Sequence, residues 1–123
     1  MLQVTREAQR LLENGWKACS HGQAVERHFT FKTFAKTWAF MDEVAAECKK
    51  QRHHPEWRNV YNKTHIRWTT HRPNGLSLKD TLMARFCDEA AKRHGELPLH
   101  DQPSQKPSTT DTRVSGVNGE NGP

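Results

Sequence analysis

The chain has 123 residues, of which 33% are hydrophobic and 27% are charged, and its formal net charge is +5. This length predicts one domain, and no stretch approaches the roughly 18 apolar residues that a membrane-spanning helix needs. Charged residues interrupt the N-terminal segment, which excludes the apolar core of a secretory signal peptide. We therefore expect a soluble protein of the cytoplasm, with the nucleus as a further candidate compartment.

The first predicted element is a helix over residues 5–14, with Thr5 as its N-cap and Gly15 at its end. Two strands follow, over residues 16–20 and 24–32, joined by a short turn. The second strand alternates apolar and polar residues, which is typical of a strand with one buried face. Its predicted apolar face carries Val25, Phe29 and Phe31.

A long helix is predicted over residues 33–50, because five apolar residues recur there at spacings of three and four. These residues are Phe34, Trp38, Met41, Ala45 and Cys48. We expect them to face the core. Pro55 disfavours helical geometry at His54, so the helix must end before that residue.

Two further strands are predicted over residues 56–61 and 65–70, joined as a hairpin around residues 62–63. A last helix starts after Ser77 as its cap and runs to about Arg93. Its predicted apolar stripe consists of Leu78, Leu82, Phe86 (or Cys87) and Ala90.

The element order is therefore helix, two strands, helix, two strands, helix. Short connections within each strand pair predict antiparallel pairing. We predict an α+β domain, in which a four-stranded antiparallel sheet carries helices packed on one face.

The composition changes sharply at position 97. Residues 97–123 hold four of the six prolines but only four apolar residues. So polar a segment cannot bury enough surface to offset the entropy that ordering costs. We predict one folded domain over residues 1–96 and a disordered polar tail over residues 97–123.

The candidates for chemistry are histidines, since four of the eight lie between positions 53 and 71. His53 and His54 end a helix just before a proline, and His71 ends a strand just before a turn. Such junctions carry functional groups more often than element interiors do, and an imidazole can donate or accept a proton near neutral pH. The alternative for each histidine is a solvated surface residue.

A metal site is not predicted. Three cysteines without a CxxC spacing argue against both a disulfide framework and a structural zinc site. A zinc ion held by His53, His54 and His71 is disfavoured, because adjacent residues rarely bind one metal and no acid or cysteine stands at ligand spacing.

Asp80 has two interpretations that the sequence leaves open. The segment Ser77-Leu78-Lys79-Asp80 resembles a capping box, with Asp in place of the usual Glu or Gln. A carboxylate at the start of a helix could also orient a nearby imidazole.

Basic and aromatic residues are interleaved between positions 49 and 72, which raises a second class of function. They are Lys49, Lys50, Arg52, Arg58, Lys63, Arg67 and Arg72 beside Trp57, Tyr61 and Trp68. Such a pattern could bind single-stranded nucleic acid. The charge excess is modest and no RNA-binding signature is present, which favours a solvated basic face.

In type and spacing, residues 53–80 resemble the pterin-4a-carbinolamine dehydratases. The matching segments are His53-His54-Pro55-Glu56-Trp57, Asn59-Val60-Tyr61-Asn62-Lys63-Thr64-His65-Ile66, Thr70-His71, and Gly75-Leu76-Ser77 with Asp80. The resemblance covers about residues 5–94. It implies a four-stranded antiparallel sheet with helices on one face, and assembly into dimers or tetramers.

The resemblance also implies an activity: removal of water from 4a-hydroxytetrahydrobiopterin to give quinonoid dihydrobiopterin, in tetrahydrobiopterin recycling, without a cofactor. It implies that His53 and His71 transfer protons, that His54 orients the pterin and that Asp80 supports the histidines. The residues implied to contact substrate are Arg52, Pro55, Trp57, Thr69, Thr70 and Arg72. For Trp57, a half-buried sheet residue is an equal alternative.

One departure from the family precedes the double histidine. Animal members commonly carry acidic residues there, whereas this chain has Lys49-Lys50-Gln51-Arg52. Arg58 and Arg67 also stand at positions that are otherwise apolar.

Two functions follow from the resemblance. The first is a dehydratase linked to aromatic amino acid hydroxylases. The second is an oligomeric interaction protein, with or without catalysis, because animal members also serve as dimerisation cofactors of a homeodomain transcription factor. We expect a pterin substrate and self-association, and neither a membrane nor a nucleic acid as partner.

Overall fold

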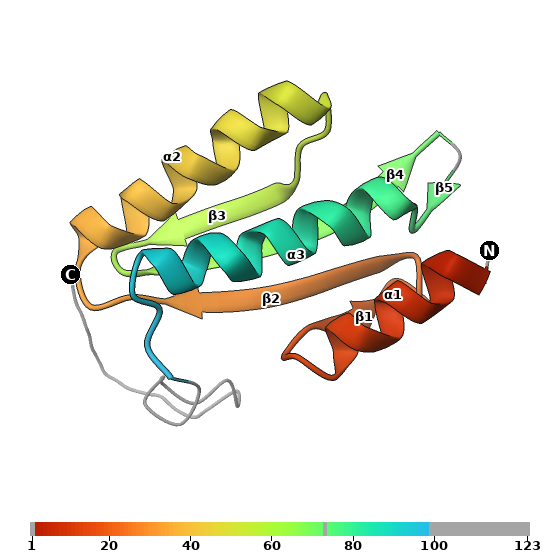
Figure 1. Ribbon diagram of the computed structural model, residues 1–123, viewed down its shortest axis with the longest axis horizontal. Coiled ribbons are helices and arrows are strands. Elements are labelled where there is room, and N and C mark those ends of the chain that lie inside the picture. The colour runs from red at the N-terminus through yellow and green to blue at the C-terminus, as the bar shows by residue number, and fades with distance from the viewer. Residues whose placement is uncertain (1, 73, 99–123) are drawn as a thin grey trace.

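The computed structural model describes residues 2–72 and 74–98, and its main elements follow the predicted order (Figure 1). In chain order they are α1 (Leu2–Leu12), β1 (Lys17–Cys19), β2 (Ala24–Thr30), α2 (Phe34–Gln51), β3 (Glu56–Val60), β4 (Lys63–His71), β5 (Asn74–Gly75) and α3 (Leu78–Arg93). The two-residue β5 was not predicted. No helix in the described ranges is long and apolar enough to cross a membrane.

The predicted tail, residues 97–123, lies outside the described residues except for Leu97 and Pro98. Its disorder, and the end of the domain at residue 96, therefore stay predictions.

The sheet is antiparallel with strand order β1-β2-β4-β3, and β5 pairs with the end of β4. The three helices cover one face, with α3 between α2 and α1 (Figure 1). The whole of β2 pairs with β4, which sets Val25 opposite Trp68. Side chains alternate along β4, so Ile66 and Trp68 are fully buried under the helices while Arg67, between them, faces the other way.

The buried face of α2 agrees only in part with the predicted one, since Met41 and Cys48 are buried as predicted. Its buried residues are Thr37, Phe40, Met41, Val44 and Cys48. Phe34 and Trp38, predicted to be core residues, are each 48% exposed and stack on one another with ring centroids 6.1 Å apart. Two apolar stripes run side by side along this helix, and spacing alone does not tell them apart. Phe40 fixes the rotation of α2 about its own axis, because its ring packs against Phe29 and Phe31.

The prediction for α3 also holds only in part, since Cys87 and Ala90 are buried as predicted. The predicted Leu78 and Leu82 are 42% and 47% exposed. The buried residues are Asp80, Thr81, Met83, Ala84, Cys87, Ala90 and Ala91. Small side chains let α3 lie close to its neighbours, so the bulkier leucines, which dominate the sequence pattern, stay at the margin of the interface.

Two helix starts test the capping predictions. Ser77 caps α3 as predicted, because it forms a capping box with Asp80. At α2 the cap is Thr33, whose hydroxyl accepts a hydrogen bond from the Lys36 amide (3.1 Å). The prediction for α1 is wrong: the helix begins at Leu2, and Thr5 lies inside it. Threonine costs an exposed helix position only a few tenths of a kcal/mol, and the buried Leu11 anchors the helix to the core.

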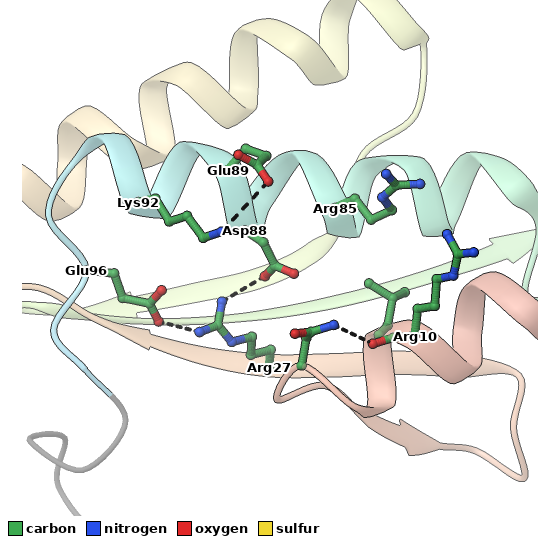
Figure 2. A pocket seen from close by; sticks show the side chains of 9 residues that line it. Arg10, Arg27, Arg85, Asp88, Glu89, Lys92 and Glu96 are labelled. Carbon is green, nitrogen blue, oxygen red and sulfur yellow. Dashed lines mark hydrogen bonds and ion pairs between the residues drawn. The ribbon is translucent and has the colours of Figure 1, made fainter.

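An arginine occupies the core face of β2. The two-residue period places Arg27 on the same side as Phe29, and its side chain is only 9% exposed. Figure 2 shows its guanidinium between Asp88 (2.8 Å) and Glu96 (2.5 Å), to which it donates hydrogen bonds. The Trp16 indole also donates to Asp88 (3.0 Å). Burial raises the pKa of Asp88, although the nearby Arg27 opposes that rise. This network fastens α3 and the segment after it to the sheet.

We expect Arg27→Ala to lower the free energy of unfolding by about 3 kcal/mol, because it removes the buried cation that both Asp88 and Glu96 contact. The matched control is Arg93→Ala, which removes a half-exposed ion pair with Glu43 and should cost less than about 1 kcal/mol. Urea unfolding of both variants measures the difference. Equal losses would contradict a structural role of the Arg27 network.

Candidate active site

Four element ends meet at one end of the molecule: the last turn of α2, the start of β3, the end of β4 and the start of α3 (Figure 1). A cavity of about 190 Å³ lies there. Seven of the ten predicted site residues line it: Arg52, His53, His54, Pro55, Thr69, Thr70 and His71. Residues that are up to 19 positions apart in the sequence are therefore brought together.

The backbone at Arg52 turns the chain from α2 into this cavity. Arg52 adopts the left-handed conformation (φ 56°, ψ 44°), and its amide donates to the Cys48 carbonyl. The His53 amide donates to the same carbonyl (3.1 Å). Arg52 therefore ends α2 in the left-handed conformation that glycine or asparagine usually adopts at a helix C-terminus. It turns the chain so that the His53 ring stacks on Trp68, with centroids 5.6 Å apart.

The Asp80 carboxylate is completely buried behind His53. One oxygen, Oδ1, lies 2.5 Å from His53 Nε2. The other, Oδ2, accepts hydrogen bonds from Thr70 Oγ1 (2.7 Å), the Ser77 amide (2.9 Å) and Ser77 Oγ (3.2 Å). Both interpretations left open by the sequence therefore hold together: Asp80 closes the capping box of α3 and orients an imidazole.

The state of His53 follows from this contact. An ionised carboxylate only accepts hydrogen bonds, so His53 Nε2 carries the proton in this pair. Nδ1 is then the ring atom that can accept a further proton. His54 and His71 line the same cavity, both are exposed, and neither ring has a hydrogen-bond partner within residues 2–72 and 74–98. Three imidazoles are thus open to a bound molecule.

Two charged residues of the cavity wall were not predicted as site residues. Arg67 Nη1 lies 3.0 Å from Glu56 Oε1, and Arg67 Nη2 donates to Ser20 Oγ (2.6 Å). Strand alternation could have found Arg67, because it shares a face of β4 with the predicted Thr69. Glu56 is its cross-strand partner in β3, which only the register reveals.

Trp57 and Arg72 do not line the cavity. Trp57 is partly buried and packs against the hydrophobic core, as its alternative interpretation states. Arg72 is exposed beyond the end of β4. Trp68 is fully buried, so it offers no surface on which a nucleic acid base could stack.

Two larger hollows, of about 320 and 500 Å³, lie along α1 and α3 and contain no histidine. The smaller cavity is the candidate site, because it alone among the three combines imidazoles with a buried carboxylate. Within the described ranges no group of three or more His, Cys, Asp or Glu residues could hold a metal ion.

Comparison with known proteins agrees with this geometry. The family model described as pterin 4 alpha carbinolamine dehydratase matches residues 2–90. A crystal structure of a transcriptional coactivator/pterin dehydratase from Brucella melitensis is similar, with 38% identity and a TM-score of 0.65; the match covers 71% of this chain and 92% of that one.

A second structure, of a pterin dehydratase-like protein identified as a RuBisCO assembly factor in the alpha-carboxysome, shares the fold. It is 20% identical, with a TM-score of 0.55, and the match covers 63% of this chain and 89% of that one. The family match spans most of the chain and the whole histidine site. The chain therefore belongs to the pterin 4 alpha carbinolamine dehydratase family.

Proposed function

We propose that this protein is a dehydratase that converts 4a-hydroxytetrahydrobiopterin to quinonoid dihydrobiopterin. The observation that carries the proposal is the pair of His53 and the buried Asp80 at a cavity that also exposes His71. Two imidazoles at one cavity supply the acid and the base that a dehydration needs.

In the proposed reaction the bond between C4a and the hydroxyl oxygen breaks. The His71 imidazolium donates a proton to that oxygen, which leaves as water. His53 Nδ1 accepts the proton of N5, and the electron pair of the N5–H bond becomes the C4a=N5 double bond. The Asp80 carboxylate stabilises the imidazolium that forms on His53. His54, exposed at the mouth, orients the pterin ring.

A second candidate function is binding of a protein partner. It is favoured by the stacked and exposed rings of Phe34 and Trp38, because exposed aromatic pairs are typical of interaction surfaces. The Brucella relative is described as both a coactivator and a dehydratase. This function should survive loss of the histidines: a complex recovered with wild type should also form with the His53→Ala, His71→Ala variant. We also propose that the protein self-associates and that it acts in the same pathway as an aromatic amino acid hydroxylase.

For the dehydratase, we expect His53→Ala combined with His71→Ala to lower the enzymatic rate by at least about 100-fold, since each proton transfer contributes about that much or more. The substrate is generated by a coupled hydroxylase, and dehydration is followed by ultraviolet absorbance. His28→Ala with His94→Ala is the matched control, because it removes two imidazoles outside the cavity. Wild-type rates in the first variant would rule out catalysis by these histidines.

We expect Asp80→Asn to lower both the free energy of unfolding, by about 2–4 kcal/mol, and the dehydration rate. The amide cannot accept all four hydrogen bonds and loses the charge that faces His53. Asp42→Asn makes the same chemical change at an exposed position of α2 and should leave both quantities unchanged. Urea unfolding and the coupled assay report them separately. A variant that keeps full stability and full activity would contradict the role of Asp80.

A further inference from the structure

The wall of the histidine cavity carries an excess of positive charge. Three charged side chains line it: Arg52, Glu56 and Arg67. Asp80 adds no accessible negative charge, because it is completely buried behind His53. A neutral ligand has no need of this charge, whereas an anionic one does.

The charge of Arg67 is already compensated. Its guanidinium pairs with Glu56 and donates to Ser20, and a contact with the Cys19 thiol also holds it in place. Burial opposes the positive charge of Arg67, but these contacts outweigh burial and raise its pKa. Arg67 is therefore a fixed and largely neutralised part of the wall.

Arg52 is the uncompensated cation. It is exposed at the cavity, and it has no ion pair or hydrogen bond from its side chain within the part of the chain that the structure describes. It also occupies a left-handed backbone position (φ 56°), where glycine or asparagine would be less strained. Strained residues of this kind concentrate at functional sites. The strained backbone and the unpaired guanidinium together indicate that the role of position 52 depends on its arginine side chain.

The cavity is large enough for the ring of a ligand but not for the substituents of that ring. About 190 Å³ is smaller than the roughly 300–1,000 Å³ of pockets that enclose whole drug-sized molecules. A bicyclic ring can fill it, and a side chain on that ring must then extend past the lining toward solvent. Arg52 lines the cavity and is exposed to solvent, so its guanidinium can meet such a side chain.

We propose that, among 4a-hydroxytetrahydropterins, this site favours those whose side chain carries an anionic group, a phosphate monoester or a carboxylate, over the neutral biopterin, and that Arg52 provides this preference. This inference rests on the proposed function, since it takes the pterin ring to occupy the histidine cavity. A guanidinium binds phosphate and carboxylate groups through paired N–H donors, so one residue can provide the preference.

The test compares three 4a-hydroxytetrahydropterins: one with a neutral dihydroxypropyl side chain, its terminal phosphate monoester, and one with a glutamate-bearing side chain. The readout is the ratio of kcat/KM for each anionic pterin to that for the neutral one. In the wild type we expect at least one of the two ratios, for the phosphate or for the glutamate-bearing pterin, to exceed one. That ratio should fall as the salt concentration rises.

Two variants of Arg52 isolate its charge. Arg52→Asn relieves the backbone strain, so it should unfold no more easily than the wild type, while the ratio falls about five- to tenfold. Arg52→Glu should lower the ratio further. Lys36→Gln is the matched control: it removes one positive charge about 24 Å away, near the other end of α2, and should leave the ratio unchanged.

The outcomes separate this inference from the proposed function. A wild-type ratio of one or below, or a ratio that is the same in the wild type and both Arg52 variants, overturns the selectivity. Dehydration of none of the three pterins overturns the proposed function instead. Calorimetric titration with the stable 7,8-dihydropterins then still tests the inference, because the anionic compounds should bind more tightly to the wild type than to Arg52→Asn.

Discussion

The structure depends most on one buried negative charge. A carboxylate with no contact to solvent is costly unless each of its acceptor positions is filled. Asp80 meets this demand with donors from three places: Ser77 at the start of its own helix, Thr70 at the end of β4, and His53 just after α2. Satisfying Asp80 therefore forces these element ends together, and the cavity is the space that their meeting leaves.

The same constraint explains why stability and chemistry are hard to separate here. The hydrogen bonds that cap α3 also hold the Asp80 carboxylate in the position from which it orients His53. The stack of His53 on Trp68 then fixes the other side of the ring. A rigid imidazole of this kind reaches its working geometry before a ligand arrives, which is the condition for efficient proton transfer.

Much of the fold could be predicted from the sequence, because alternation, caps and turns are local signals. The cap at Ser77 and the short connections within the strand pairs were predicted correctly, and so was the order of the main elements. The faces of the helices could be predicted only in part, because Phe34 and Trp38 on α2 satisfy the same periodicity as the residues that are buried. Which stripe faces the sheet depends on the fit of Phe40 against the strands, and that contact is not local.

The site divides in the same way. His53, His71 and Asp80 stand at junctions that the sequence marks, so they could be named in advance. The partners of Arg67 at the site, and of Arg27 in the core, could not be predicted, because they come from other strands or helices: Arg67 meets Glu56 of β3, and Arg27 meets Asp88 of α3. Cross-strand and cross-layer partners are set by register and packing, which composition and spacing do not encode.

His53 and Asp80 lie 27 positions apart in the sequence, so their contact depends on tertiary packing. Helices and hairpins form from neighbouring residues, but this pair exists only when α2, β4 and α3 are packed together. In a collapsed state with native helices and loosened side-chain packing, the far-ultraviolet signal persists while the packing that creates the pair is lost. Loss of the His53–Asp80 pair, and with it of the proposed proton transfer, would therefore report loosened packing of this domain before its helix content changes.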